Sequence, residues 1–281
     1  MSGAIGGTIQ EVPGGFSELS GGIRRIVRTG WSWQKPLTIN AEECPFCTKN
    51  EGEVLAVGET KEGWRILESN LSLFKFHRLI IPKTCWDADR LWELGGEEAI
   101  LEALTVASFM THGSDRELWL TIHIGWLAGQ NQSHLHWHLY NWDDGQNSSL
   151  PPELEHERLR PDRLVFEESG FTVSAGGLKA GQCFITPSAD SSFGTEGFRH
   201  GLARTIYRLV TLGNRKLRSA EGLPANFNLG FVFTKENRLL LGTYCPVINH
   251  WGPADVLGLI LKRKVVLVTP HEAMAEYLRG E

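Results

Sequence analysis

The sequence lacks any apolar run that could cross a membrane, and it has few cysteines for its length. No stretch approaches the roughly 18–20 consecutive apolar residues that a spanning helix needs. Its beginning has neither the charged start nor the apolar core of a secretory signal. Five cysteines in 281 residues do not suggest a disulfide scaffold. We therefore expect no membrane partner and a reducing compartment, the cytoplasm.

An excess of basic residues is also missing. Lys and Arg number 28 against 33 Asp and Glu, which gives a formal net charge of −5 at pH 7. Nucleic-acid-binding proteins usually present a basic surface, so we expect no nucleic-acid partner, although a local basic pocket for phosphate stays compatible with this balance. A hydrophobic content of 41% and a charged content of 22% are ordinary for a globular protein. The length suits one large domain or two of ordinary size.

The run from Gln132 to Tyr140 is the most informative stretch that is present. Its alternating histidines and apolar residues are His134, Leu135, His136, Trp137, His138 and Leu139. Period-two alternation predicts a half-buried strand whose alternate side chains point to opposite faces. The histidines would share one face at spacings of about 7 Å. The apolar residues, including Trp137, would pack in the core. A surface strand can also carry three histidines without any chemistry, so other motifs must decide.

The alternation, preceded by Gly129-Gln130, resembles the motif of the histidine-triad superfamily. The resemblance implies that the middle histidine, His136, attacks the α-phosphate of a nucleotide and becomes transiently nucleotidylated. Neutral imidazole suits this role because its unperturbed pKa lies near 6.5. A covalent intermediate divides one hard displacement into two easier ones. Either a neighbouring backbone carbonyl or a side chain must hold the other ring nitrogen as N–H, and the sequence leaves this choice open.

The resemblance also implies which residues meet the phosphate. The second catalytic residue, His138, would stabilise the non-bridging oxygens. Backbone N–H groups and short polar side chains in the loop at 126–133 suit a bound phosphate. His123 stands on an expected strand, where relatives usually have asparagine, and is either a substrate contact or an exposed strand residue. The expected substrate contacts are Gln130, Asn131, Ser133, His123 and His77.

A second recurring element of the superfamily is Gly-His followed by four apolar residues and Pro-Lys. The run His77–Lys83 resembles it, with Phe76 in place of the glycine and Arg78 in place of an apolar residue. In relatives this element often continues to a histidine that binds zinc. Here that position is Cys85.

Cys44-Pro45-Phe46-Cys47 is a Cys-x-x-Cys motif, which brings two thiolates to one metal, usually zinc. The redox alternative places this motif at the start of a helix after a strand, and the polar loop at 40–53 gives no such context. By resemblance to zinc-bearing relatives, the ligands are Cys44, Cys47, Cys85 and His134. Four protein ligands leave no open position for water, so this zinc would be structural. The alternative for Cys85 is a small buried hydrophobe.

The hydrophobic patterns, together with the resemblance, predict an α+β fold of tandem histidine-triad-like half-units, with helices packed on antiparallel sheets. Gln182–Pro187 echoes His77–Pro82, and no triad follows it. Residues 16–27 read as a short amphipathic helix or as an arm packed on a partner subunit. The expected organisation is a flexible arm at 1–35, a catalytic half with the zinc motif at 36–141, a linker at 142–165 and a degenerate half at 166–281.

A tandem arrangement is similar to the branch that contains galactose-1-phosphate uridylyltransferases and dinucleoside-tetraphosphate phosphorylases. The expected function is a nucleotidyltransferase or phosphorylase acting on a nucleotide sugar or dinucleoside polyphosphate. Inorganic phosphate or a sugar 1-phosphate would be the acceptor, in a homodimer. Two alternatives stay open. One is a hydrolase that uses water as the acceptor. His138 favours it, because the uridylyltransferase and phosphorylase branch often has glutamine at this third position of the triad. The other is a catalytically silent nucleotide- or zinc-binding protein.

Overall fold

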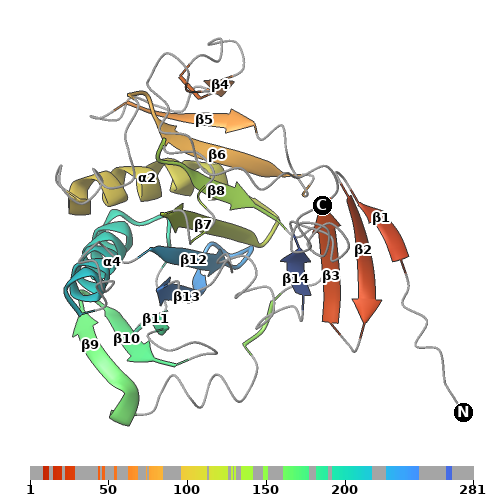
Figure 1. Ribbon diagram of the computed structural model, residues 1–281. Helices are drawn as coiled ribbons and strands as arrows, with labels where there is room; N and C mark the ends of the chain where they lie inside the picture. The colour runs from red at the N-terminus through yellow and green to blue at the C-terminus, as the bar shows by residue number, and fades with distance from the viewer. Residues whose placement is uncertain are drawn as a thin grey trace, which may run out of the picture.

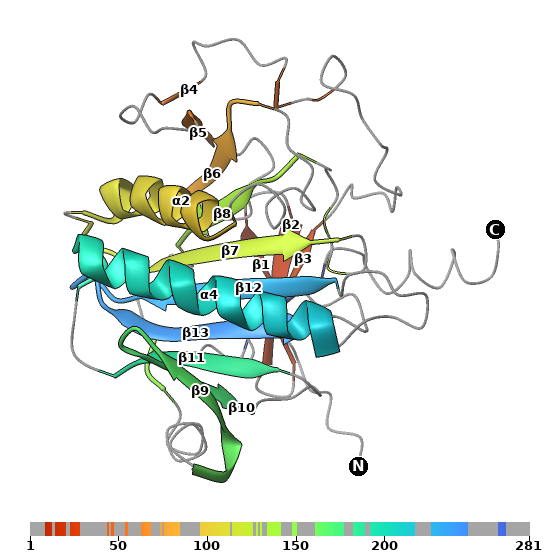
Figure 2. The same ribbon diagram turned by 90° about the vertical axis from the view of Figure 1, so that its left-hand side faces the viewer.

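Most of the described chain forms one antiparallel sheet of ten strands with two helices on one face (Figures 1 and 2). This arrangement comes from a computed structural model and confirms the predicted α+β class. The described residues are 9–12, 15–20, 23–28, 44, 46–47, 54–55, 63–68, 74, 76–84, 96–112, 114–125, 128, 130, 134–141, 148–150, 161–176, 182–188, 192–216, 226–246 and 264–267. Neither helix of these segments is long and apolar enough to span a membrane.

The sheet is built from two consecutive sets of elements. The first set is β4 (Val54–Leu55), β5 (Trp64–Glu68), β6 (His77–Pro82), α2 (Gly96–Thr111), β7 (Leu118–Ile124) and β8 (Trp137–Tyr140). The second set, after the 3-10 turn η3 (Pro161–Arg163), is β9 (Leu164–Glu168), β10 (Phe171–Ala175), β11 (Cys183–Pro187), α4 (Glu196–Lys216), β12 (Phe227–Phe233) and β13 (Leu239–Pro246). The strand order is β4-β5-β6-β8-β7-β12-β13-β11-β10-β9.

The two sets repeat each other. Each contains three strands, a helix and two strands, and each places its last strand fourth from the edge, between its third and fourth strands. β7 and β12 pair antiparallel at the centre, with Thr121 opposite Gly230. The strand order therefore matches from either edge inwards, as a local twofold relation between the halves requires. This confirms the tandem half-units predicted from the sequence, while the domain boundaries proposed above stay predictions.

Backbone detail fixes how the two halves correspond. Gly63 precedes β5 and Gly170 precedes β10, and both have positive φ, 67° and 87°. The Gly63 carbonyl accepts a hydrogen bond from Lys83 N at 2.7 Å, and the Gly170 carbonyl accepts one from Ser188 N at 2.8 Å. Lys83 directly follows β6 and Ser188 directly follows β11. β6 therefore matches β11 residue by residue, as the sequence echo predicted.

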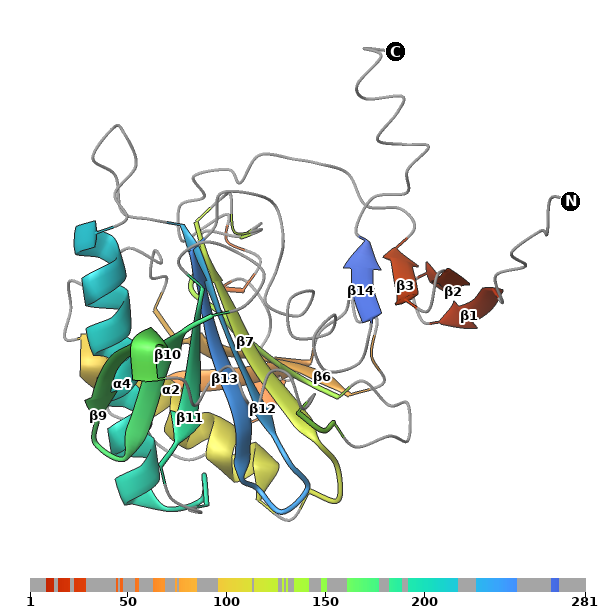
Figure 3. The same cartoon turned by 90° about the horizontal axis from the view of Figure 1, so that it is seen from below.

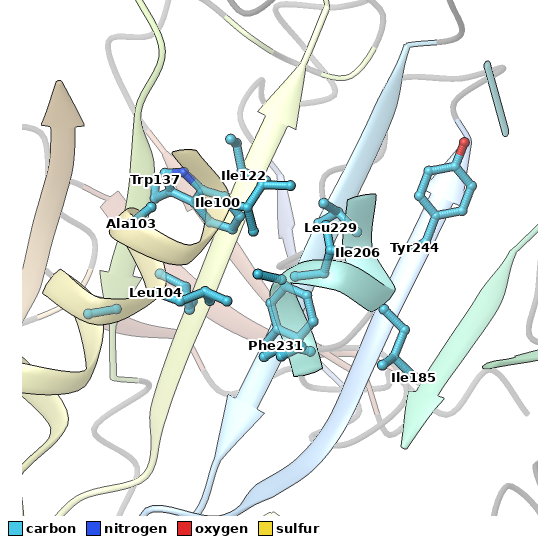
Figure 4. Close-up of a cluster of buried hydrophobic side chains, with 14 of the residues drawn as sticks. Ile100, Ala103, Leu104, Ile122, Trp137, Ile185, Ile206, Leu229, Phe231 and Tyr244 are labelled. Atoms are coloured by element: carbon cyan, nitrogen blue, oxygen red, sulfur yellow. The ribbon is translucent and has the colours of Figure 1, made fainter. Parts of the chain in front are cut away.

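The core lies between the sheet and the helices. α2 contributes Ile100 and Leu104, and α4 contributes Ile206, all fully buried. Figure 4 shows them against the strand residues Ile122, Trp137, Leu229 and Phe231. Each such side chain contributes roughly 1.5–3 kcal/mol through its burial. Because the helices occupy one face, alternate strand residues point to the other face, and the candidate site lies there.

The N-terminal segment differs from the prediction. Residues 16–27 do not form a helix, because β1 (Ile9–Val12), β2 (Gly15–Ser20) and β3 (Ile23–Arg28) form an antiparallel meander there. β14 (Lys264–Leu267) joins β3 in parallel. Figure 3 shows this four-stranded sheet on the side of the large sheet away from the helices. The missed signals are Pro13-Gly14 and Gly21-Gly22, two-residue connections typical of hairpins.

Candidate active site and metal centre

The histidine run divides between strand and loop. The strand predicted from Gln132 forms regular pairing only from Trp137, so His134 and His136 precede β8. Trp137 is buried in the core beside Ile122, which confirms its predicted packing role. His138 pairs with Thr121 and therefore points to the face without helices.

His136 is held in one tautomer by the backbone. Its Nδ1 lies 2.7 Å from the carbonyl oxygen of His134, and because a carbonyl only accepts, Nδ1 carries the hydrogen. The neutral ring then has its lone pair on Nε2. Burial lowers the pKa of His136 to about 4, against the opposing hydrogen bond to His134. A backbone carbonyl is thus the group that holds the second ring nitrogen, one of the two options open from the sequence.

His138 lies at the centre of an imidazole cluster. His77 Nε2 is 3.0 Å from His138 Nδ1, with ring centroids 5.2 Å apart. His136 and His123 approach the same ring edge-on, at 4.9 Å and 5.4 Å between centroids. His136 is only 4% exposed, whereas His138 is half-buried. The structure therefore brings four predicted site residues from three strands and a loop into one cluster.

His123 links the two halves of the chain. Its Nδ1 donates to the carbonyl oxygen of Ala128 at 2.9 Å. Its side chain also hydrogen-bonds Asn228, which stands opposite it on β12. Burial, the largest cause, lowers the pKa of His123 below its usual value. The alternative of an exposed strand residue is wrong, because His123 is half-buried within the cluster.

Gln130 closes the loop after β7. Its Oε1 accepts a hydrogen bond from Gly125 N at 2.7 Å, and its own N donates to the Gly125 carbonyl at 3.3 Å. Gly125 has a φ of 88°, and a Cβ there would overlap the Asn226 side chain. The loop therefore depends on glycine at this position. Two other predicted substrate contacts, Asn131 and Ser133, lie outside the described residues.

Two cysteines and the first triad histidine form a candidate metal centre. The ligand atoms of Cys44, Cys47 and His134 all lie within 4.8 Å of one another. His134 Nε2 donates to the Pro82 carbonyl at 3.1 Å, which leaves Nδ1 facing the two sulfurs at 3.2 and 3.4 Å. Two thiolates and an oriented imidazole fit zinc. The fourth predicted ligand, Cys85, lies outside the described residues, three positions after Pro82.

Sequence reasoning missed two residues beside the candidate metal centre, Phe46 and Arg65. The Phe46 ring packs edge-on against His134 at 5.7 Å and against His136 at 5.2 Å between centroids. The Phe46 carbonyl accepts a hydrogen bond from Arg65 Nη2 at 3.0 Å, which attaches the cysteine turn to β5. An apolar residue between two metal-binding cysteines was the available signal for Phe46. Arg65 had none, because its partner is a backbone atom distant in sequence.

Asn228 was also missed as a site residue, although the sequence held a signal. Asn228 is the one polar side chain in the otherwise apolar run Phe227–Phe233. Asn228 is fully buried, and a buried amide in a strand needs a polar partner. The partner is His123, which only the pairing of β7 with β12 reveals.

Comparisons with known proteins agree on the fold. No protein-family model and no curated protein matches the sequence. Among solved structures, a uridylyltransferase matches at 16% identity and a TM-score of 0.57, over 96% of both chains. An ADP-glucose phosphorylase from Arabidopsis thaliana, with ADP-glucose bound, matches at 12% identity and 0.56, over 95% of this chain and 96% of that one. A yeast Ap4A phosphorylase in complex with AMP matches at 12% and 0.51, over 97% and 83%. This chain therefore has the fold that these uridylyltransferase and phosphorylase structures share.

Proposed function

We propose that this protein is a nucleotidyltransferase or phosphorylase that acts on a nucleotide sugar or a dinucleoside polyphosphate through a covalent intermediate on His136. The observation that carries the proposal is the 2.7 Å hydrogen bond from His136 Nδ1 to the His134 carbonyl, which leaves the Nε2 lone pair for attack. The shared fold supports it, because the solved neighbours include a uridylyltransferase and phosphorylases of ADP-glucose and Ap4A.

The reaction would proceed in two displacements. The Nε2 lone pair of His136 forms a bond to the α-phosphorus while the bond to the leaving phosphate oxygen breaks, and that oxygen keeps the electron pair. An oxygen of inorganic phosphate or of a sugar 1-phosphate then attacks the same phosphorus, and the P–N bond electrons return to Nε2. The leaving group and the acceptor are both phosphate oxygens, so the chemistry needs little proton transfer.

The residues around His136 would stabilise the charge that develops on the phosphoryl oxygens. His138 lies beside the nucleophile, with a centroid distance of 4.9 Å, and is the more exposed of the two rings. In this proposal Gln130, Asn131 and Ser133 supply further donors from the loop. Preorganised donors act strongly in a site from which water is excluded. His77 and His123 would complete the wall behind His138.

Zinc would hold the site in shape rather than take part in the reaction. In this proposal Cys44, Cys47, His134 and Cys85 bind it, and the full set of protein ligands leaves no position for substrate. One residue serves both functions: the His134 ring faces the cysteines and the His134 carbonyl holds the nucleophile. A homodimer and a cytoplasmic location remain predictions from the sequence.

The test is a product analysis. The protein is incubated with dinucleoside polyphosphates and nucleotide sugars, with and without inorganic phosphate, and the nucleotides are separated by ion-exchange chromatography. Phosphate-dependent release of a nucleoside diphosphate identifies a phosphorylase. With a sugar 1-phosphate added, exchange of the nucleotidyl group identifies a transferase. A nucleoside monophosphate in every sample identifies a hydrolase.

Replacement of the nucleophile separates the covalent mechanism from its alternatives. His136→Asn removes the attacking nitrogen and should abolish both turnover and a nucleoside-monophosphate adduct seen in intact mass spectra of the wild type. His200→Asn, an exposed histidine on α4, is the matched control and should behave as wild type. Unaltered turnover in folded His136→Asn would refute the mechanism. An inactive wild type across the whole panel would favour a silent binding protein.

A further inference from the structure

The hydrogen bond between His77 and His138 has two possible directions. A hydrogen bond joins His77 Nε2 and His138 Nδ1 at 3.0 Å, and one of these two nitrogens must donate. If His77 donates, neutral His138 carries its own hydrogen on Nε2. If His138 donates, its Nε2 carries only a lone pair. The direction of this bond therefore decides whether His138 offers a donor or an acceptor beyond the pair.

The second half of the chain contains the same contact with its direction fixed. Leu79 pairs with His138, and the matching residue Phe184 pairs with Thr243, so Thr243 stands in the place of His138. By the same match, Gln182 stands in the place of His77. Gln182 Nε2 lies 3.2 Å from Thr243 Oγ1, as His77 Nε2 lies 3.0 Å from His138 Nδ1.

In this second pair the Thr243 hydroxyl accepts a hydrogen bond from Gln182, which directly precedes β11. Thr243 Oγ1 donates its single hydrogen to the Cys183 carbonyl at 3.2 Å, because a carbonyl only accepts. Its contact with Gln182 must then be one in which Gln182 donates. Both partners are almost completely buried, so the bond is shielded from competing water. The residue before the strand is the donor, and the residue on the inner strand is the acceptor.

From this repeat we infer that His77 is a positioning residue that donates from Nε2 to Nδ1 of His138 and thereby fixes the hydrogen of His138 on Nε2. The inference rests on the proposed function for its purpose, because an N–H on His138 can bind a phosphoryl oxygen whereas a lone pair repels it. His77 then acts through His138 rather than by touching substrate. This differs from the direct substrate contact expected from the sequence.

The matching residue also suggests the variants that test this direction. His77→Gln keeps a side-chain N–H donor, as the second half does with Gln182. His77→Leu fills similar space without a donor. Comparison of the two separates hydrogen bonding from packing, because both lose the imidazole ring. His200→Gln, at an exposed position on α4, controls for the loss of one histidine.

The deciding measurement is the tautomer of His138 in the substrate-free protein. The wild type is labelled with 15N-histidine, the His138 ring signals are assigned by their loss in His138→Asn, and long-range 1H–15N correlations locate the ring hydrogen. We expect Nε2–H in the wild type and in His77→Gln, and a mixture or the other tautomer in His77→Leu. An Nδ1–H ring in the wild type overturns the inference, as does an unchanged tautomer in His77→Leu.

The second measurement is the turnover of the same variants. With the substrate identified above, His77→Leu should lower kcat by roughly 100-fold, at the lower end of the cost of one lost donor to a developing anion, with a smaller change in KM. His77→Gln should retain most of kcat. Equal losses in both variants contradict the inference. Because the tautomer is measured without substrate, failure of the proposed function leaves that result intact, and the two failures are distinguishable.

Discussion

Burial changes the acid–base properties of single residues in the second half as well as in the site. Cys183 on β11 is 7% exposed, and burial raises the pKa of its thiol from the usual 9.0 to about 11. Between these two values the unfolded chain has lost its proton while the native chain keeps it. The native state then binds more protons, so its stability must fall as pH rises above 9.

Cys183→Val should remove this alkaline sensitivity. Between pH 8 and pH 10 the wild type should lose about 1 kcal/mol of stability through this thiol, since one pKa unit corresponds to about 1.4 kcal/mol. Urea unfolding at both pH values measures the difference. The variant should show a smaller decrease by that amount, whatever its stability at pH 8. Identical decreases would show that Cys183 ionises as easily in the folded protein as in the unfolded chain.

The candidate metal ligands give a second prediction at the scale of residues. Cys44→Ser with Cys47→Ser should lower both the zinc content, measured by atomic emission, and the melting temperature. Under the proposed function turnover should fall as well, because the His134 ring faces the cysteines and its carbonyl holds His136. Cys183→Val removes a thiol outside the group and should keep its zinc. Loss of metal with unchanged melting would contradict a structural role for zinc.

At the scale of elements, α4 closely approaches β13 at Gly213. Gly213 lies in the helix, and a Cβ there would overlap the hydroxyl oxygen of Tyr244. The Tyr244 side chain is fully buried, so it has little room to move. Alanine would gain up to about 1 kcal/mol of helix propensity, but the overlap costs more.

Gly213→Ala should therefore lower the free energy of unfolding by about 1–3 kcal/mol, measured in urea. Adding Tyr244→Phe removes the oxygen and should restore part of the loss, because the ring carbon Cζ would still be 2.9 Å from the new Cβ. Gly197→Ala is the matched control in the same helix, since nothing lies within 4 Å of its Cβ. A destabilised Gly197→Ala with a neutral Gly213→Ala would contradict this account.

The elements that the sequence predicted well are those with a strong local pattern. β6 and β7, which carry His77 and His123, lie where the sequence placed apolar strands. The N-terminal strands were missed because their side-chain pattern is mixed, and pairing with β14 near the other end of the chain completes their sheet. β8 is shorter than its alternation suggested, because His134 leaves the ladder to face the cysteines.

The site residues that belong to a sequence motif could be predicted. Spacing and resemblance pointed to His134, His136 and His138 and to the two cysteines. The contacts of Phe46, Arg65 and Asn228 depend on chain segments brought together by folding, and no local pattern records them. The tautomer of His136 depends on a hydrogen bond from Nδ1 to a backbone carbonyl. Every residue has such a carbonyl, so the sequence indicated that Nδ1 needs an acceptor but not which residue supplies it.

At the scale of the whole molecule, the two halves share one sheet and one core. β7 and β12 pair along seven residues each, and α2 packs beside α4 with Glu97 and Arg204 3.3 Å apart. That exposed ion pair contributes little, whereas the shared apolar core contributes most of the stability. Separation of the halves would expose the β7 edge and the helix side of the core.

Residues 36–141 expressed alone should therefore not form a stable monomer. We expect either an unfolded chain or a dimer in which two copies pair through β7, in place of the native pairing with β12. Light scattering coupled to size exclusion measures the mass, and circular dichroism follows melting. Co-expression with residues 142–281 is the control and should restore a soluble complex. A monomeric fragment with a cooperative melt would show that the first half is an independent domain.

The repeat has a consequence for how this sequence can change over evolutionary time. Thr243 occupies the place of His138, and Leu239 and Leu241 precede it at the spacing of the other two triad histidines. Under the proposed function, the second half bears structural selection where the first bears chemical selection. Volume-preserving replacements there should accumulate without effect on turnover. Asn228 is the exception, because its side chain crosses to His123. Asn228 should therefore tolerate replacement less well than Leu239, Leu241 and Thr243 do.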